Sequence, residues 1–192
     1  MAAGVRLGWQ HKFGLGAQAP ALRVDLVADD FLARENGRSG RAGSAALSVR
    51  KRFGTSWRVL LGHEFNRYDG KAHAFDRTDG ETTATLNADL SRTWRISLTG
   101  RHRHGGVLSY ATPPHPVLVK AGKALTTVTS FDRDQPMIAY YFIARTDAVR
   151  LELGHTLGPR SELVLAIERR TTSQGPVTYA NRPVSLSLNH SF

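Results

Sequence analysis

The last nine residues, Val184-Ser185-Leu186-Ser187-Leu188-Asn189-His190-Ser191-Phe192, carry the clearest structural signal in the chain. Apolar or ring-bearing side chains alternate in them with small polar ones. Successive side chains of a β-strand point to opposite faces of a sheet. The stretch therefore predicts a strand with one apolar and one polar face.

The same alternation recurs along the whole chain. It predicts nine strands, at about residues 4–13, 20–33, 43–53, 56–68, 81–91, 93–104, 137–157, 160–171 and 183–192. We interpret 137–157 as one long strand, although Arg145-Thr146-Asp147 would also allow a split there. The sequence thus predicts an all-β protein with an antiparallel sheet.

The expected connections alternate between short and long. Short turns are predicted near residues 14–20, 54–56, 91–93 and 158–160, and longer polar loops near 34–43, 69–80, 105–136 and 172–182. Short turns at one end and long loops at the other are typical of transmembrane β-barrels of the outer membrane. The longest loop, 105–136, would either fold into a lumen or remain at the surface.

Aromatic residues on the apolar face are expected beside the short turns. They are Phe13, Phe53, Trp57, Trp94 and Phe192. Aromatic rings favour the headgroup depth of a bilayer, so a group of them at one end of the strands indicates an interfacial girdle. The core of a soluble β-sandwich or calycin-like barrel, which is the alternative fold, gives no reason for this grouping.

Composition excludes several other classes. No stretch of the 192 residues approaches the roughly 18 apolar residues of a membrane-spanning helix. The chain has no cysteine, so disulfides and cysteine metal sites are excluded. Its net charge is +10, but the basic residues are spread along the strands rather than clustered, and we predict no nucleic-acid binding.

The terminal strand resembles the assembly signal of Gram-negative outer-membrane β-barrel proteins. The residues that carry the resemblance are Val184, Leu186, Leu188, His190 and Phe192, with His190 where an aromatic residue is more usual. The resemblance implies location in the outer membrane of a Gram-negative bacterium, contact with outer-membrane lipid, and recognition by the barrel assembly machinery.

The strand count bears on domain organisation. Nine strands are an odd number, whereas bacterial single-chain barrels have even numbers. We therefore expect residues 1–192 to be a single barrel domain, incomplete at its N-terminus, that forms the C-terminal part of a larger barrel.

The polar face of the predicted strands is rich in charge. Its expected lumen-lining residues are Arg6, Arg23, Arg50, Arg52, Arg58, Arg95, Arg101, Arg103, Arg150, Glu152 and Glu168. A water-filled lumen with a basic excess would attract anions. In a small closed barrel, the same side chains would instead pair across a packed interior.

The sequence predicts no catalytic residues, no cofactor and no metal ion. His102 and His104 share a strand face, but Arg101 and Arg103 flank them and disfavour a cation. Asp29-Asp30, near the expected outer rim, is the best carboxylate pair, with His63-Glu64 on another strand, but nothing in the sequence fixes their geometry.

Two stretches resemble the C-terminal barrel of surface lipoprotein assembly modifiers. The first is Arg67-Tyr68-Asp69-Gly70 followed by Phe75-Asp76-Arg77, and the second is Ser173-Gln174-Gly175-Pro176 followed by Tyr179. The resemblance implies a pore that exports or displays lipoproteins. We therefore expect a transport or translocation barrel, for lipoprotein or small anionic solutes. The alternative is a structural or adhesive surface barrel with a packed lumen and partner-binding loops.

Overall fold

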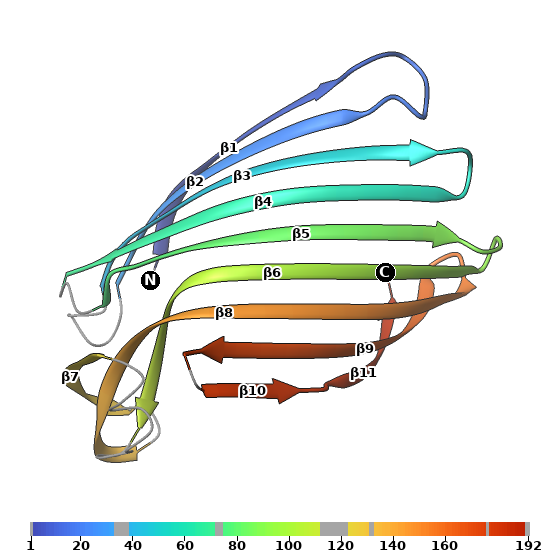
Figure 1. Ribbon diagram of the computed structural model, residues 1–192. Coiled ribbons are helices and arrows are strands. Elements are labelled where there is room, and N and C mark those ends of the chain that lie inside the picture. The colour runs from blue at the N-terminus through green and yellow to red at the C-terminus, as the bar shows by residue number, and fades with distance from the viewer. Residues whose placement is uncertain are drawn as a thin grey trace.

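The computed structural model describes residues 2–32, 39–71, 75–111, 123–130, 133–175 and 177–190, which form one antiparallel sheet (Figure 1). No α-helix occurs in these residues. The strands are β1 (Ala2–Lys12), β2 (Ala21–Phe31), β3 (Gly40–Phe53), β4 (Trp57–Gly70), β5 (Arg77–Asp89), β6 (Trp94–Ala111), β7 (Lys123–Ser130), β8 (Arg133–Gly158), β9 (Ser161–Gln174), β10 (Val177–Asn181) and β11 (Val184–His190).

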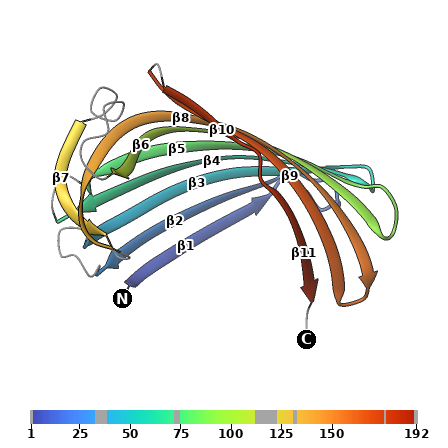
Figure 2. The same ribbon diagram turned by 90° about the horizontal axis from the view of Figure 1, so that it is seen from below.

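The strands follow one another as neighbours in the order β1-β2-β3-β4-β5-β6-β8-β9-β10. β11 also pairs with β9, beyond Pro183, whose carbonyl accepts a hydrogen bond from the Glu168 amide. Figures 1 and 2 show a curved, twisted sheet. Its two edges, β1 on one side and β10–β11 on the other, do not pair with each other within the described residues. The sheet is therefore open.

All nine expected strands are present, and the all-β antiparallel prediction is confirmed. β8 runs unbroken through Arg145 and Asp147, as expected for one long strand. The short turns after β1, β3, β5 and β8 also lie where the sequence predicts them. Gly54, with a φ of 60°, supplies the left-handed conformation in the turn between β3 and β4.

Residues 105–136 differ from the expected irregular loop. β6 continues to Ala111, β7 occupies Lys123–Ser130, and β8 begins at Arg133. β7 pairs with the edge of β8 that β9 occupies further along, so it extends the sheet beyond the end of β9. The sequence prediction failed here because β7 is defined by its hairpin pairing with β8, which local alternation does not reveal. Whether residues 112–122 line a lumen lies outside the described residues.

In β1–β6, in β8 from Arg145 onward, and in β9 and β11, most large apolar side chains point to the same side, which we call the apolar face. Along one register row, Leu86 lies beside Leu98, and Leu98 lies beside Leu151. A one-residue slip would turn a strand's side chains over, so matching faces fix the register. The opposite side, which carries most of the charged residues, is the polar face.

The apolar face is more exposed to solvent than the polar face. On the apolar face, Val149 and Ile167 remain 56% and 50% exposed. On the polar face of the same strands, Ala148 and Glu168 are only 6% and 3% exposed. No second layer covers either face within the described residues, so the difference comes from curvature, which crowds side chains on the inner side. The polar face is therefore concave (Figure 2).

The apolar band crosses the sheet obliquely. The register row through Leu7 and Phe65 is apolar on β1–β4 but reaches Arg145 on β8. The row that is apolar on β6–β9 reaches β4 at Val59, six residues, or about 20 Å, further toward the turns. Strands that lie tilted to a band of constant height produce such a stagger.

Candidate functional site: the polar face

All residues predicted to line a lumen lie on the polar face. The register places Arg52 opposite Arg58 and Arg150 opposite Glu168, and period-two alternation places the rest on the same side. The sequence therefore predicted correctly that these side chains share one face. Whether that face encloses water remains a prediction.

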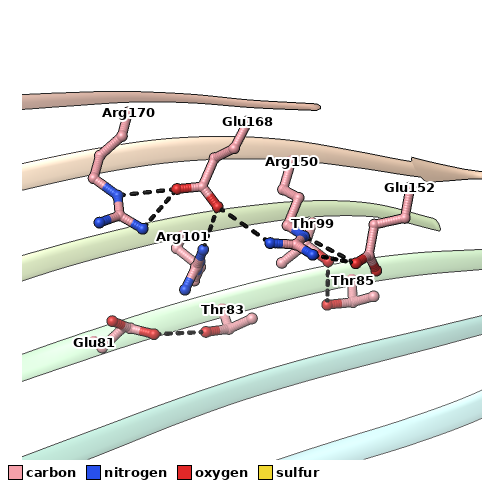
Figure 3. Close-up of polar contacts among 9 residues, drawn as sticks. All are labelled: Glu81, Thr83, Thr85, Thr99, Arg101, Arg150, Glu152, Glu168 and Arg170. Atoms are coloured by element: carbon pink, nitrogen blue, oxygen red, sulfur yellow. Dashed lines mark hydrogen bonds and ion pairs between the residues drawn. The ribbon is translucent and has the colours of Figure 1, made fainter. Parts of the chain in front are cut away.

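Glu168 of β9 is the centre of the most extensive ion-pair network (Figure 3). One carboxylate oxygen, Oε1, lies 2.7 Å from Nη2 of Arg170, and the other, Oε2, lies 2.7 Å from Nη2 of Arg101 on β6. Arg150 of β8 approaches within 3.9 Å. A buried carboxylate needs such partners, because burying it unpaired is costly. The network thus ties three neighbouring strands together.

Arg150 also holds the second predicted acid, Glu152. Its Nη2 and Nε donate to Oε1 of Glu152 at 2.7 and 2.9 Å. Beside this pair, the hydroxyls of Thr85 and Thr99 lie 3.1 Å apart across β5 and β6 (Figure 3). On the polar face of β6, β8 and β9, Arg101, Arg150 and Arg170 therefore each have an acidic partner.

A glycine makes room for the third ion pair. Arg95 of β6 reaches across β8 to Glu162 of β9, with 2.7 Å between Nε and Oε1. Gly154 of β8 lies under this pair, opposite Arg95 in the register. A Cβ at Gly154 would stand 2.8 Å from both the Arg95 and Glu162 atoms. The side chains can bridge two strands only because the residue between them has none.

Sequence reasoning misplaced Asp79, an acid of the polar face. Asp79, which was placed in a loop, lies at the start of β5 and is buried. Its carboxylate accepts a bond of 3.0 Å from Arg103 and one of 3.3 Å from Asn66. Asp79 is in phase with Glu81 and Thr83, so continuing the period-two pattern backward by one step would have found it.

The apolar face carries the expected aromatic residues. Phe13, Phe53, Trp57 and Trp94 are exposed there, beside the short turns, while Phe192 lies outside the described residues. Trp94 stacks on His155 with 4.1 Å between ring centroids. The named aromatic residues thus lie at one end of the sheet, which we call the short-turn end.

The terminal strand is also exposed. Val184, Leu186 and Leu188 point to the apolar face at the free edge of β11. His190 Nδ1 lies 2.9 Å from the Ser161 hydroxyl. The strand therefore presents an apolar stripe of alternate residues, which is the feature that carries the resemblance to the assembly signal, and one of its edges is unpaired within the described residues.

The candidate histidines His102 and His63 each bond a residue of a neighbouring strand, whereas the candidate acids Asp29 and Glu64 line one open pocket on the polar face. His102 bonds Asp147, 2.7 Å away on β8, and Asp147 also binds Arg145. His63 bonds Thr82 at 2.9 Å. No group of three potential metal ligands occurs in the part of the chain that the structure describes. Nor does any helix in that part have the length and apolar character needed to cross a membrane.

The two segments compared above with surface lipoprotein assembly modifiers lie at two connections, β4–β5 and β9–β10. The Gly70 amide at the end of β4 donates to Oδ1 of Asp76, 2.8 Å away, and Phe75 is buried. Tyr179 on β10 is exposed. In comparisons with known proteins, no family model and no curated protein matches the chain. The site must therefore be interpreted from its own geometry.

Proposed function

We propose that this chain forms part of the wall of an outer-membrane β-barrel that serves as a transport or translocation pore. The observation that carries the proposal is the inverted distribution of polarity. Large apolar side chains cover the exposed apolar face, whereas arginines and carboxylates occupy the concave polar face. In a bilayer, the first face would contact lipid and the second would surround water.

A soluble sandwich explains these features less well. It would bury the apolar face under a second sheet, and the described residues form one sheet only. It would also expose the charged face, yet Glu168 and Asp79 are buried there. The aromatic residues at the short-turn end match the interface of a membrane. Closure of the open sheet requires further strands or another copy of the chain.

The charge of the polar face favours anionic solutes as cargo, because its arginines outnumber its carboxylates. The resemblance to surface lipoprotein assembly modifiers adds exported lipoprotein as a second cargo to test.

The long strands suggest an additional role. β8 has 26 residues, whereas about ten suffice to cross a bilayer. The part of β8 beyond this length, together with β6 and β7, would project from the bilayer and offer a surface for binding partners. Partner binding is the alternative function.

Two adjacent residues of β6 provide the test. Leu98 lies on the apolar face, and Ser97 lies on the polar face opposite Glu152. Leu98→Arg should destabilise the protein in lipid by about 2–4 kcal/mol, the cost of a cation at mid-depth on the lipid side. Ser97→Arg should leave stability nearly unchanged, because the new charge faces a carboxylate.

Conductance in planar bilayers distinguishes the pore from other folds. The protein with its barrel closed, by further strands or by another copy of the chain, should require detergent and conduct ions, and Ser97→Arg should shift the reversal potential toward stronger anion preference. A soluble sandwich would also be destabilised by Leu98→Arg, so the conductance measurement decides. Absence of channels from the closed barrel, or selectivity unchanged by Ser97→Arg, would exclude the pore and favour the adhesive alternative.

A further inference from the structure

Basic side chains converge on the polar face at the short-turn end of β1, β3 and β4. Lys12, Arg50, Arg52 and Arg58 line an open pocket of about 470 Å³, together with small residues of the turn between β1 and β2. We call these four residues the basic cluster. No acidic residue lines the pocket in the described part of the chain.

The basic cluster is poorly neutralised. Arg52 and Arg58 lie directly opposite each other, a like-charge pair that costs stability in an antiparallel sheet. Asp89 is the carboxylate they share, 3.4 Å from Arg58 and 4.0 Å from Arg52. Arg52 also donates from Nη2 to the Thr55 carbonyl, while its buried Nε has no hydrogen-bond partner in the described residues.

The chemistry of the cluster selects its ligand. Guanidinium groups bind planar or tetrahedral oxyanions through paired N–H donors, and they bind phosphate especially well. Four basic side chains and one carboxylate, Asp89, sum to a net charge of +3, which suits a ligand with at least two negative charges. The cluster lies on the polar face, away from the face that we assign to lipid, which indicates a water-soluble ligand.

We infer that the basic cluster is a binding site for a soluble solute that bears a phosphoryl group. This assignment deepens the proposed function, since it names the class of anion that the pore would take. It depends on the proposed function only for the place of the site inside a pore. Binding itself requires no conduction, so the two can be tested separately.

Calorimetric titration of the full chain in detergent with inorganic pyrophosphate, in 0.15 M NaCl, tests the site. Saturable binding of one pyrophosphate per chain is expected. The double variant Arg52→Gln/Arg58→Gln should weaken it by about tenfold or more, because both forks are lost. Asp89→Asn should tighten binding severalfold, because it removes the competing carboxylate.

The matched control is Arg6→Gln/Arg77→Gln, which removes the same charge from the polar face further from the short turns, in the middle of β1 and at the start of β5. It should change the affinity less than twofold. Absence of saturable binding, an equal loss in both double variants, or weaker binding by Asp89→Asn would overturn the inference. Short-chain phosphatidic acid added to the micelles should not compete, and competition would overturn the assignment to a soluble ligand. A chain that binds pyrophosphate but forms no channel would refute only the proposed function.

Discussion

The basic side chains are paired with carboxylates to different extents in the two halves of the polar face. On β6, β8 and β9, the arginines pair with carboxylates, above all with Glu168. On β1, β3 and β4, the basic cluster shares the single carboxylate of Asp89. Both halves have the same alternation and the same curvature. The difference therefore lies in the placement of acids and not in the backbone.

This difference separates structural charge from charge that is available for binding. In the C-terminal half, ion pairs cross the strands and satisfy buried carboxylates, so they contribute to stability. In the N-terminal half, Arg52 and Arg58 repel each other, and stability does not explain their presence. Substitutions in the two halves should consequently have opposite effects on unfolding.

The largest effect is expected at Glu168. Glu168→Gln would remove the buried negative charge and leave Arg101, Arg150 and Arg170 facing one another. Breaking a buried ion pair from one side typically costs about 3–5 kcal/mol. The arginines are partly exposed, so we expect a loss of about 2–3 kcal/mol in the free energy of unfolding, measured in detergent with denaturant.

Glu81→Gln is the matched control for this substitution. Glu81 lies on the same face, and within the described residues its carboxylate has one weak hydrogen bond, of 3.5 Å, from the Thr83 hydroxyl. Its loss of charge should change stability by less than about 0.5 kcal/mol. Equal effects at Glu81 and Glu168 would show that total charge, rather than the network, governs stability.

Much of this arrangement could be predicted from the sequence. Alternation alone predicted every strand from β1 to β6 and placed Arg150, Glu152 and Glu168 on one face. It works because a strand's side chains obey a strict period of two, and one face of this sheet is consistently apolar. The short turns were also predictable, since they interrupt the alternation with Gly, Pro and Ser.

Contacts between distant strands could not be predicted in this way. Asp147 pairs with His102, and Arg95 with Glu162, across separations of 45 and 67 residues. These contacts depend on the register between strands. Alternation does not fix the register, because a shift by any even number of residues keeps every side chain on the same face. β7 was missed for a different reason: it is adjacent to β8 in the sequence, but its pairing with β8, rather than its own alternation, defines it. The role of Gly154 likewise becomes apparent only when Arg95 and Glu162 lie on either side of it.

An intermediate effect is expected from Gly154→Val. The added side chain would occupy the space over which Arg95 and Glu162 meet, and overpacking of this kind typically costs about 1–3 kcal/mol. The measurement is again the free energy of unfolding in detergent. Gly100→Val on β6 is the control, because a Cβ there meets nothing within 4 Å. If valine lowered the free energy of unfolding equally at Gly100 and Gly154, the strands would require glycine for their backbone conformation, and not to make room for the ion pair between Arg95 and Glu162.

The smallest effect, with the opposite sign, is expected at Arg58. Its ion pair with Asp89 is largely exposed, and such pairs contribute about 0–1 kcal/mol. Arg58→Gln would lose that contribution but would relieve the repulsion with Arg52, which then has Asp89 to itself.

We therefore expect Arg58→Gln to leave the free energy of unfolding unchanged or to raise it by about 0.5 kcal/mol. Arg58→Lys keeps the charge and should show no gain. Because salt screens like charges, any gain should shrink when unfolding is measured in 1 M NaCl. A loss of more than about 1 kcal/mol would mean that Arg58 is structural, and the contrast between the two halves would then disappear.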